Sequence, residues 1–460
     1  MRVNDMFRYQ NISLPEDILR RKICGDYEEA IRLIDLRMQD DRLPEELRYC
    51  MQVHREMMVR MPSEFPHTYE AGLNMVRERI PDFTKEEFDR LIDERRIRWL
   101  YINGEMRLVR SFFASLVKAY PGFAQRAGEV LPGSESAVGK IPLLDESMAN
   151  MKQKGAATKR IRIQAMLKLK DEHFKPGMFI RAHLPLPAVC DQQSDIRIEK
   201  ISPAGGQIAP EDALQRTVCW EGNMEENHEF SVEYSYIHKA CYHDTENMTG
   251  ESGSYDFCLE EEEPHIVFTP YIRALTAKLT DGVADPLEKA RRIYDYITLN
   301  MNYTFVPNYF QMEKIAENCA LSFNGDCGVF ALLFITLCRC AGIPAKWQSG
   351  LVAEPMFCGC HDWAQFYVAP HGWLFADPSF GIAAHRNKNE ERRKFYFGNL
   401  DPYRMVANSA FEASFTIPKD HWRCDPYDNQ MGEIETSDRG FLYSEFDQDK
   451  KTLLCEEIEL

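Results

Sequence analysis

Cys327 stands where a cysteine could act as a nucleophile. It follows the turn-forming residues Asn324-Gly325-Asp326 and opens an apolar run that predicts a helix. A helix N-terminus favours the thiolate because amide dipoles stabilise its negative charge, and the backbone N–H of Cys327 could donate to an oxyanion. A buried structural cysteine is the commoner case for any single cysteine. We assign Cys338 and Cys340, further along the same run, to that class.

His361 and Asp377 could complete a catalytic site with this cysteine. A thiolate nucleophile needs a base within hydrogen-bond reach, and the base needs a third group that fixes its orientation. His361 opens one strand-like run and Asp377 closes the next, with the turn Pro370-His371-Gly372 between them. Antiparallel strands joined in this way place both residues at the same end of a hairpin. A structural histidine and a turn aspartate explain each residue singly. The three positions together predict Cys327 as nucleophile, His361 as base and Asp377 as orienting group.

The cysteines also allow two rival interpretations. The run Cys358-Gly359-Cys360-His361 packs soft ligands together, and Cys327 or Cys319 could add a fourth for zinc. The Cys-x-Cys spacing is tighter than in usual zinc sites, and no distant Cys/His pair has finger-like spacing. A disulfide between Cys327 and a nearby thiol would instead be a redox control. No calcium-loop pattern is present, so we expect neither a metal nor a cofactor.

The elements that must position these residues are predicted around them. Asp285-Pro286 has the cap-and-proline pattern of a helix start. The helix expected at Cys327 should end where Gly342 and Pro344 stop it. Three strand-like runs follow, at Ala345–Leu351, Asp362–Val368 and Trp373–Asp377. This order predicts a helix bearing the cysteine that packs on an antiparallel sheet.

Several motifs carry a resemblance to a known family. They are Gly325-Asp326-Cys327, the helix end at 338–345, the pair His361-x-Trp363, and Gly372-Trp373 before Asp377-Pro378. Together with the helix at 290–297 and Tyr303, they resemble the transglutaminase-like superfamily, which has a papain-like cysteine enzyme core, in a bacterial-type form. The resemblance covers about residues 270–385. The chain departs from the family pattern at Trp347, Gln348, Asp362 and Gln365.

The resemblance implies acyl transfer from an amide through a thioester on Cys327, with His361 and Asp377 completing the triad. Family members include transglutaminases, proteases, deamidases and peptide N-glycanases. We favour a cysteine hydrolase, peptidase- or amidase-like, that acts on peptide or side-chain amides, because water is the default acceptor. A protein-glutamine transglutaminase is the alternative enzyme, and a non-catalytic binding or scaffold protein with this fold is the alternative outside enzymes. Asn324 and Tyr303 are the candidates for a side chain that assists the oxyanion.

The rest of the chain completes an expected α+β protein, with a papain-like transglutaminase core preceded by a β-sandwich and a helical region. Capping-box spacing at Ser13–Glu16 and Thr84–Glu87 indicates helices, Asn103-Gly104 indicates a hairpin, and the alternation at 161–169 indicates strands. We expect four parts: a mostly helical N-terminal region at 1–155 with a linker at 126–155, a β-sandwich domain at 156–262, a transglutaminase-like catalytic domain at 263–420, and an acidic C-terminal tail at 421–460.

The composition and charge of the chain limit the classes of partner that it can bind. The 460 residues carry a formal net charge of −17, which disfavours nucleic acid and anionic membrane as partners. No apolar stretch is long enough to span a bilayer, and the N-terminus lacks the apolar core of a signal peptide. We therefore expect a cytoplasmic protein whose 14 cysteines are mostly reduced and whose partner is a peptide or protein substrate.

Overall fold

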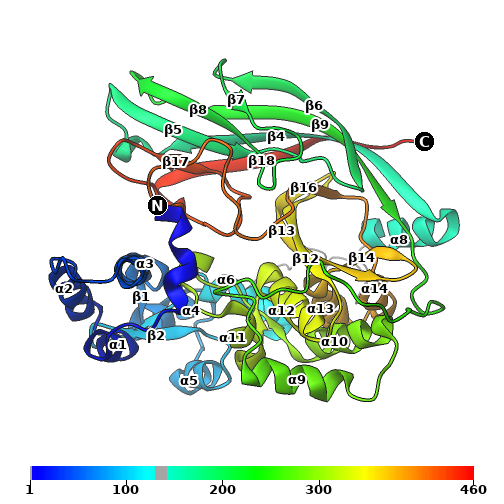
Figure 1. The fold of residues 1–460 in the computed structure, drawn as a ribbon, viewed down its shortest axis with the longest axis horizontal. Coiled ribbons are helices and arrows are strands. Elements are labelled where there is room, and N and C mark those ends of the chain that lie inside the picture. The colour runs from blue at the N-terminus through cyan, green and yellow to red at the C-terminus, as the bar shows by residue number, and fades with distance from the viewer. Residues whose placement is uncertain (1–2, 130–141, 460) are drawn as a thin grey trace.

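The computed structural model describes residues 3–129 and 142–459. Helices form a layer in one half of the molecule, and long antiparallel strands form two sheets in the other (Figure 1). The hairpin of β12 (Ala345–Glu354) and β13 (Phe357–Val368) runs between the two halves. The chain is therefore an α+β protein, as its sequence predicts.

The N-terminal region is mostly helical. Thr84 and Glu87 form the predicted capping box of α5, and the hairpin turns at Asn103 and Gly104, whose φ angles of 49° and 87° suit a type I′ turn. The elements are η1 (Val3–Asp5), η2 (Phe7–Asn11), α1 (Glu16–Ile23), α2 (Tyr27–Arg37), α3 (Glu45–Glu64), β1 (His67–Thr68), α4 (Tyr69–Arg79), α5 (Lys85–Asp93), β2 (Trp99–Ile102), β3 (Glu105–Leu108), α6 (Phe112–Ala119) and α7 (Pro121–Arg126).

Two expectations about this region are wrong. The capping box predicted at Ser13 does not form, because α1 begins after Pro15 and has no side-chain cap. The predicted linker at 126–155 is partly the helix α8 (Pro142–Lys154), which buries Leu144, Met148 and Met151. Residues 130–141 of that linker lie outside the described part of the chain. Small residues suggested a linker here, but burial of three long apolar side chains stabilises a helix.

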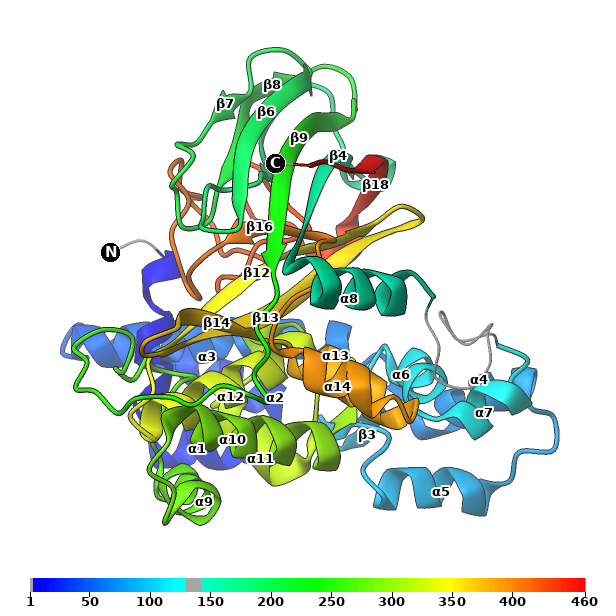
Figure 2. The same cartoon turned by 90° about the vertical axis from the view of Figure 1, so that its right-hand side faces the viewer.

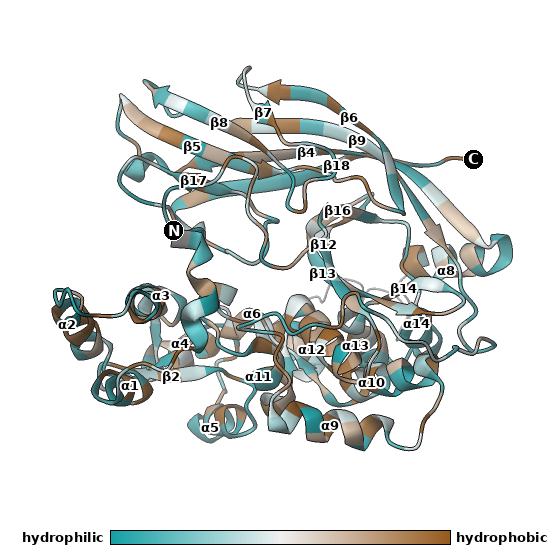
Figure 3. Cartoon of the chain, in the orientation of Figure 1, coloured by the Kyte–Doolittle hydropathy of each residue, from teal (hydrophilic) through white to brown (hydrophobic). Residues whose placement is uncertain are grey.

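The next region forms two packed sheets. Their orders are β17-β5-β8-β7 and β18-β4-β9-β6, and the shared core contains Ile161, Leu184, Val218 and Tyr234. Alternating polar and apolar bands run along the strands, as a half-buried sheet requires (Figure 3). The elements are β4 (Ala156–Leu169), η3 (Asp171–His173), β5 (Met178–Pro185), β6 (Gln193–Ser202), β7 (Gln207–Ile208), β8 (Thr217–Met224), β9 (Phe230–Cys241), β17 (Glu433–Glu435) and β18 (Phe446–Glu457).

The segment 421–460 is not the peripheral tail predicted from its acidic composition. β17 pairs with β5, and β18 pairs with β4 along most of its length, so this segment supplies an outer strand to each sheet. β18 exposes most of its side chains, which hides its strand character in the sequence. The 3₁₀ turn η5 (Tyr443–Glu445) precedes β18.

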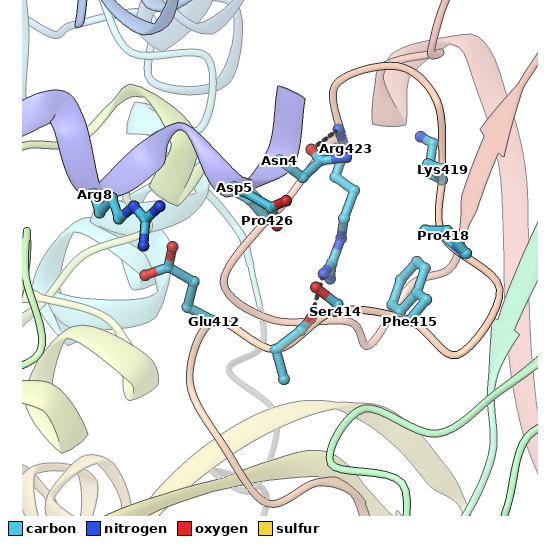
Figure 4. Close-up of a pocket in the computed structure, with 11 residues that line it drawn as sticks. Asn4, Asp5, Arg8, Glu412, Ser414, Phe415, Pro418, Lys419, Arg423 and Pro426 are labelled. Atoms are coloured by element: carbon cyan, nitrogen blue, oxygen red, sulfur yellow. Dashed lines mark hydrogen bonds between the residues drawn. The ribbon is translucent and has the colours of Figure 1, made fainter. Parts of the chain in front are cut away.

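The N-terminus holds the loop that leads into β17. A cavity of about 370 Å³ lies between η1 and residues 412–426. Figure 4 shows Arg8 and Glu412 facing one another across it. The backbone N–H of Arg423 donates to Oδ1 of Asn4 at 2.9 Å, and its guanidinium donates to the carbonyl of Ala413 at 3.0 Å. These contacts anchor a loop that contributes two side chains to the candidate site below.

The core that carries Cys327 packs helices against a five-stranded sheet of order β15-β14-β13-β12-β16. Figure 2 shows α10, α12 and α13 lying beneath this sheet. The remaining elements are α9 (Pro270–Thr280), α10 (Pro286–Asn300), β10 (Asn302–Tyr303), η4 (Tyr309–Gln311), α11 (Ile315–Ser322), β11 (Asn324–Gly325), α12 (Cys327–Cys340), β14 (Gly372–Ala376), α13 (Pro378–Arg386), α14 (Glu390–Phe395), β15 (Phe397–Gly398) and β16 (Arg404–Asn408).

The predicted starts of α10 and α12 and the predicted stop of α12 are confirmed. Asp285 accepts hydrogen bonds from the first backbone amides of α10, and Asp326 does the same for α12 at Val329 N. Gly342 ends α12 with a φ of 80°. Within residues 3–129 and 142–459, no helix combines the length and the apolar character that a membrane span needs.

Candidate active site

Cys327 is the first residue of α12, at the place where a helix presents free backbone amides. Asp326 fixes this end of the helix. Its Oδ1 accepts from Val329 N at 3.1 Å and from the Tyr309 hydroxyl at 2.7 Å. Oδ1 of Asp326 thus holds the turn that positions the nucleophile candidate.

Gly328, the residue after Cys327, allows a close approach of three side chains. A Cβ atom at this position would lie 2.1 Å from the Tyr309 hydroxyl oxygen, 2.8 Å from Asp362 Oδ2 and 2.8 Å from the Trp347 ring. Any larger residue would therefore push apart the groups that surround the thiol. The packing explains why glycine follows the cysteine here.

His361 and Asp377 meet as predicted. Their Nε2 and Oδ2 atoms are 2.7 Å apart, and both side chains are buried. The other carboxylate oxygen of Asp377 accepts from Phe380 N at 2.9 Å. The guanidinium of Arg404 lies 3.0 Å from Oδ2, and this arginine was not identified from the sequence. Because Nε2 is engaged with Asp377, Nδ1 is the ring nitrogen left to receive a proton.

Burial favours a neutral imidazole at His361, while hydrogen bonds and the Arg404 cation favour an ionised carboxylate at Asp377. Burial lowers the pKa of His361, although Asp377 opposes the effect. Burial alone would raise the pKa of Asp377, but its interactions with His361 and Arg404 outweigh burial and hold that pKa below its usual value. A neutral histidine is the form that can accept a proton from a thiol.

The thiol of Cys327 donates a hydrogen bond to Asp362, the neighbour of His361 on β13. Its Sγ lies 3.1 Å from Asp362 Oδ2, and among the described residues no hydrogen bond joins it to His361. Successive side chains of a strand project to opposite faces, so His361 and Asp362 leave β13 on different sides. The structure thus joins His361 to Asp377 and, separately, Cys327 to Asp362.

At this point β13 has lost one of its two strand neighbours. β14 pairs with β13 only from Val368 back to Ala364, where Ala376 is the last partner. Residues 361–362 therefore have a strand neighbour, β12, on one side only. The start of α12 lies against this stretch of β13, because Cys327 and Gly328 both approach the Asp362 carboxyl.

A second buried carboxyl faces Asp362. Asp428 interacts with the Asp362 carboxyl and accepts from Asn408 Nδ2 at 2.7 Å and from the Ser349 hydroxyl. Gln430 donates to Oδ1 of Asp362 and, at 3.3 Å, to the His361 carbonyl. Asp428 and Gln430 lie in the segment predicted to be a tail. No local sequence motif marks them.

The buried, acidic surroundings raise the pKa of Cys327, whereas the sequence predicts that the helix N-terminus lowers it. A helix N-terminus alone would lower the pKa of Cys327, but burial, followed by the charges of Asp362 and Asp326, raises it well above its usual value. Burial, and then Asp428, raises the pKa of Asp362. The thiol in this arrangement is protonated, and it donates its hydrogen bond to a carboxyl group.

The two oxyanion candidates differ in their contacts. Asn324 uses its amide nitrogen to donate to the carbonyls of Ser322 at 2.8 Å and Arg95 at 3.3 Å. Tyr303 is buried, and its pKa is raised by burial and next by Cys327, which places its hydroxyl in the electrostatic range of the thiol. The amide of Asn324 is already occupied, so Tyr303 is the better placed of the two.

Cys358 and Cys360 of the rival zinc interpretation lie on β13, whereas Cys319 lies on α11 and Cys327 on α12. Across the described ranges, no group of three or more His, Cys, Asp or Glu side chains is arranged to hold a metal ion. Cys360 lies 3.8 Å from the Lys450 ammonium.

Part of this core matches the model of a known protein family. Residues 273–378 match the family model of the transglutaminase-like superfamily, and this range includes Cys327, His361 and Asp377. These residues form a transglutaminase-like core. The match ends at residues 273 and 378, so the N-terminal helices and the β-sandwich lie outside it.

Relatives of this transglutaminase-like core are distant. The uncharacterized protein YebA of Bacillus subtilis (strain 168) is 26% identical over 130 residues, which are 24% of this chain and 18% of YebA, so the chain spans less than a fifth of that relative. A candidate cysteine protease from Cytophaga hutchinsonii has a TM-score of 0.44 at 15% identity, over 66% of this chain and 92% of its own. The periplasmic domain of TgpA from Pseudomonas aeruginosa has a TM-score of 0.28 at 14% identity, over 54% of this chain and 96% of its own.

Proposed function

We propose that this protein is a cysteine hydrolase that cleaves peptide or side-chain amides through a thioester on Cys327. The observation that carries the proposal is the buried His361–Asp377 pair, with Arg404 beside it, on the stretch of β13 whose Asp362 contacts the start of α12. A histidine kept neutral by burial and oriented by an ionised carboxylate is the base that a thiol needs.

The proposed reaction begins with a rotation of the Cys327 side chain away from Asp362. The thiol proton passes to Nδ1 of His361 as the sulfur attacks the amide carbonyl. The backbone N–H of Cys327 and the Tyr303 hydroxyl stabilise the resulting oxyanion. His361 then gives its proton to the leaving amine as the C–N bond breaks. A water molecule attacks the thioester, loses a proton to His361, and releases acid product and free thiol.

Asp362 has a distinct place in this proposal. It holds the thiol in its protonated form until a substrate occupies the site, so the resting protein carries an unreactive cysteine. Asp377 and Arg404 act through His361, because their contacts fix its ring and stabilise the imidazolium. We also propose that the protein is cytoplasmic.

The non-catalytic alternative also has an observation in its favour. The raised pKa of Cys327 and its bond to Asp362 are what a binding protein with a disused site would show. A transglutaminase differs from the hydrolase only in the acceptor, an amine in place of water.

Trapping of the acyl-enzyme tests the proposal. The protein is mixed with a panel of peptide and glutamine-side-chain amides, quenched in acid, digested and analysed by mass spectrometry. We expect acyl adducts on the Cys327 peptide and acid product in solution, and neither with Cys327→Ala. Acid product formed at an unchanged rate by Cys327→Ala would contradict the mechanism, and substrate binding without turnover would favour the binding protein.

A further inference from the structure

A second cavity, of about 650 Å³, lies between the N-terminal helices and the transglutaminase-like core. Its size falls within the range typical of small-molecule and peptide sites. The proposed chemistry does not use it. Most of its wall is apolar and comes from the N-terminal region, including Leu19, Met61, Phe65, Ile97 and Trp99.

Three polar groups of this wall lack partners. The guanidinium of Arg98 makes no hydrogen bond or ion pair with any residue at 3–129 or 142–459, and burial lowers its pKa. Thr304 Oγ1 and Gln311 Oε1 are buried and unbonded, with residue exposures of 5% and 7%. Buried polar groups without partners are costly, so a site that holds Thr304 Oγ1 and Gln311 Oε1 beside the unpaired Arg98 guanidinium suits a polar ligand.

The charge of the cavity is opposite to that of the chain. Lys22, Arg95 and Arg98 line it against a single acidic residue, Glu313, which is paired with Lys22. The whole chain has a net charge of −17. Tyr27 also lines the wall and stays neutral, because burial raises its pKa to about 12. A guanidinium at an apolar wall matches a carboxylate on an apolar body, since its fork can donate two parallel hydrogen bonds.

The cavity adjoins the turn that holds the nucleophile candidate. Asn324 lines it and belongs to β11, which pairs in parallel with β10. Thr304 lines it as well, and its backbone N–H donates to the Gly325 carbonyl at 2.7 Å. Cys327 follows two residues after Gly325. Asp326, the cap of α12, is the main charge that favours the protonated form of Arg98.

We propose that this cavity binds the carboxylate-bearing, apolar end of a peptide substrate, with Arg98 as the anion-binding residue. The inference rests on the proposed hydrolase and names its substrate class: peptides with a free carboxylate next to an apolar side chain. It also gives the N-terminal region a role, because the segment between α5 and β2 supplies Arg98 and this region supplies most of the apolar wall.

Binding to the Cys327→Ala protein tests the site without requiring turnover. The probes are N-acetyl-Leu-Phe as the free acid and as its C-terminal amide, measured by calorimetry and by tryptophan fluorescence, since Trp99 lines the cavity. We expect the acid to bind about ten- to a hundredfold more tightly than the amide, as is typical for a hydrogen bond to a charged group. Arg98→Gln should remove this preference.

Arg96→Gln is the matched control. Arg96 lies two residues away, is paired with Glu94 at 2.6 Å, and does not line the cavity. It should keep the preference for the acid. Equal binding of acid and amide to the parent protein, or a preference that survives Arg98→Gln, would overturn the proposal.

Competition separates a substrate site from an effector site. In the active protein, the acid probe should inhibit hydrolysis of a carboxylate-bearing peptide competitively, and Arg98→Gln should raise KM with little change in kcat. Inhibition or activation that is independent of substrate concentration would assign the carboxylate to a separate small molecule and overturn the substrate assignment. If no hydrolysis is found for any substrate, the proposed function fails while the binding result still decides the carboxylate site.

Discussion

The thiol of Cys327 donates a hydrogen bond to Asp362, the residue that directly follows the proposed base on β13. Asp362 also interacts with the buried carboxyl of Asp428, and Gln430 completes its contacts. The nucleophile candidate is therefore held by an acidic group that raises its pKa. In the resting protein the thiol is protonated and donates to Asp362, whereas the proposed reaction needs it to give its proton to His361.

Asp362→Asn should make Cys327 more reactive. The amide can still accept a hydrogen bond, but it removes the negative charge that disfavours the thiolate, so the pKa of Cys327 should fall. Brief labelling with iodoacetamide between pH 6 and 8, followed by peptide mapping, measures this. We expect labelling several-fold faster than in the parent protein.

Two controls accompany that experiment. Cys424 in the same sample is buried and should label slowly in both proteins, and Asp420→Asn, at a largely exposed site, should leave Cys327 unchanged. Slower labelling of Cys327 in Asp362→Asn would show that Asp362 is the proton acceptor of the thiol, which would displace His361 from the role of base.

Asp362→Asn should also change how stability depends on pH. The pKa of Asp362 is raised in the folded protein, so its stabilising effect is complete below the unfolded value of about 3.9 and is lost as pH rises through the folded value. An asparagine has no such dependence. From about pH 4 upward, urea midpoints of the parent should therefore fall relative to those of the variant. A constant difference between the two proteins across pH 4 to 8 would contradict the raised pKa.

Gly328→Ala should destabilise the protein and impair the site. The new methyl group would meet the Tyr309 hydroxyl, which holds Asp326, and the Asp362 carboxyl. Overpacking of this kind costs about 1–3 kcal/mol. Adding Tyr309→Phe removes the nearest clashing atom, so the double variant should be more stable than the sum of the single changes predicts. Chemical denaturation of all four proteins measures the coupling. Strict additivity would mean that the hydroxyl does not limit the space at Gly328.

The sequence predicts the local features of the core well because they depend on neighbouring residues. The cap of α10, the start of α12 at Cys327, the stop at Gly342 and the meeting of His361 with Asp377 each follow from a short motif or a tight turn. The sign of the pKa shift at Cys327 does not follow in this way. It depends on Asp362 and on burial, and burial is a property of the folded chain.

Other parts of the site could not be predicted for a related reason. Asp428 and Gln430 reach Asp362 across 66 and 68 positions of the chain, and Arg404 reaches Asp377 from a different strand. Such pairings leave no periodic signal. β18 escaped notice because an edge strand with mostly exposed side chains lacks the alternation that marks a half-buried one. Asp362 was visible only as a departure from the family pattern.

Product analysis with and without an amine separates the hydrolase from the transglutaminase. Once a substrate is found, a hydrolase should release acid product at a rate little changed by a primary amine at modest concentration. A transglutaminase should divert the thioester to amide, because an amine bound beside the acyl group has a large proximity advantage over water. Cys327→Ala should abolish both products. Asp377→Asn should slow both by several orders of magnitude, since the equivalent change in a serine triad costs about 10⁴-fold.

Asp401→Asn is the matched control, because Asp401 pairs with Arg404 but makes no hydrogen bond to His361 among the described residues. It should cost far less activity. Amide as the main product would keep the triad and replace hydrolysis with transamidation, whereas near-normal rates in Asp377→Asn would remove Asp377 from the mechanism.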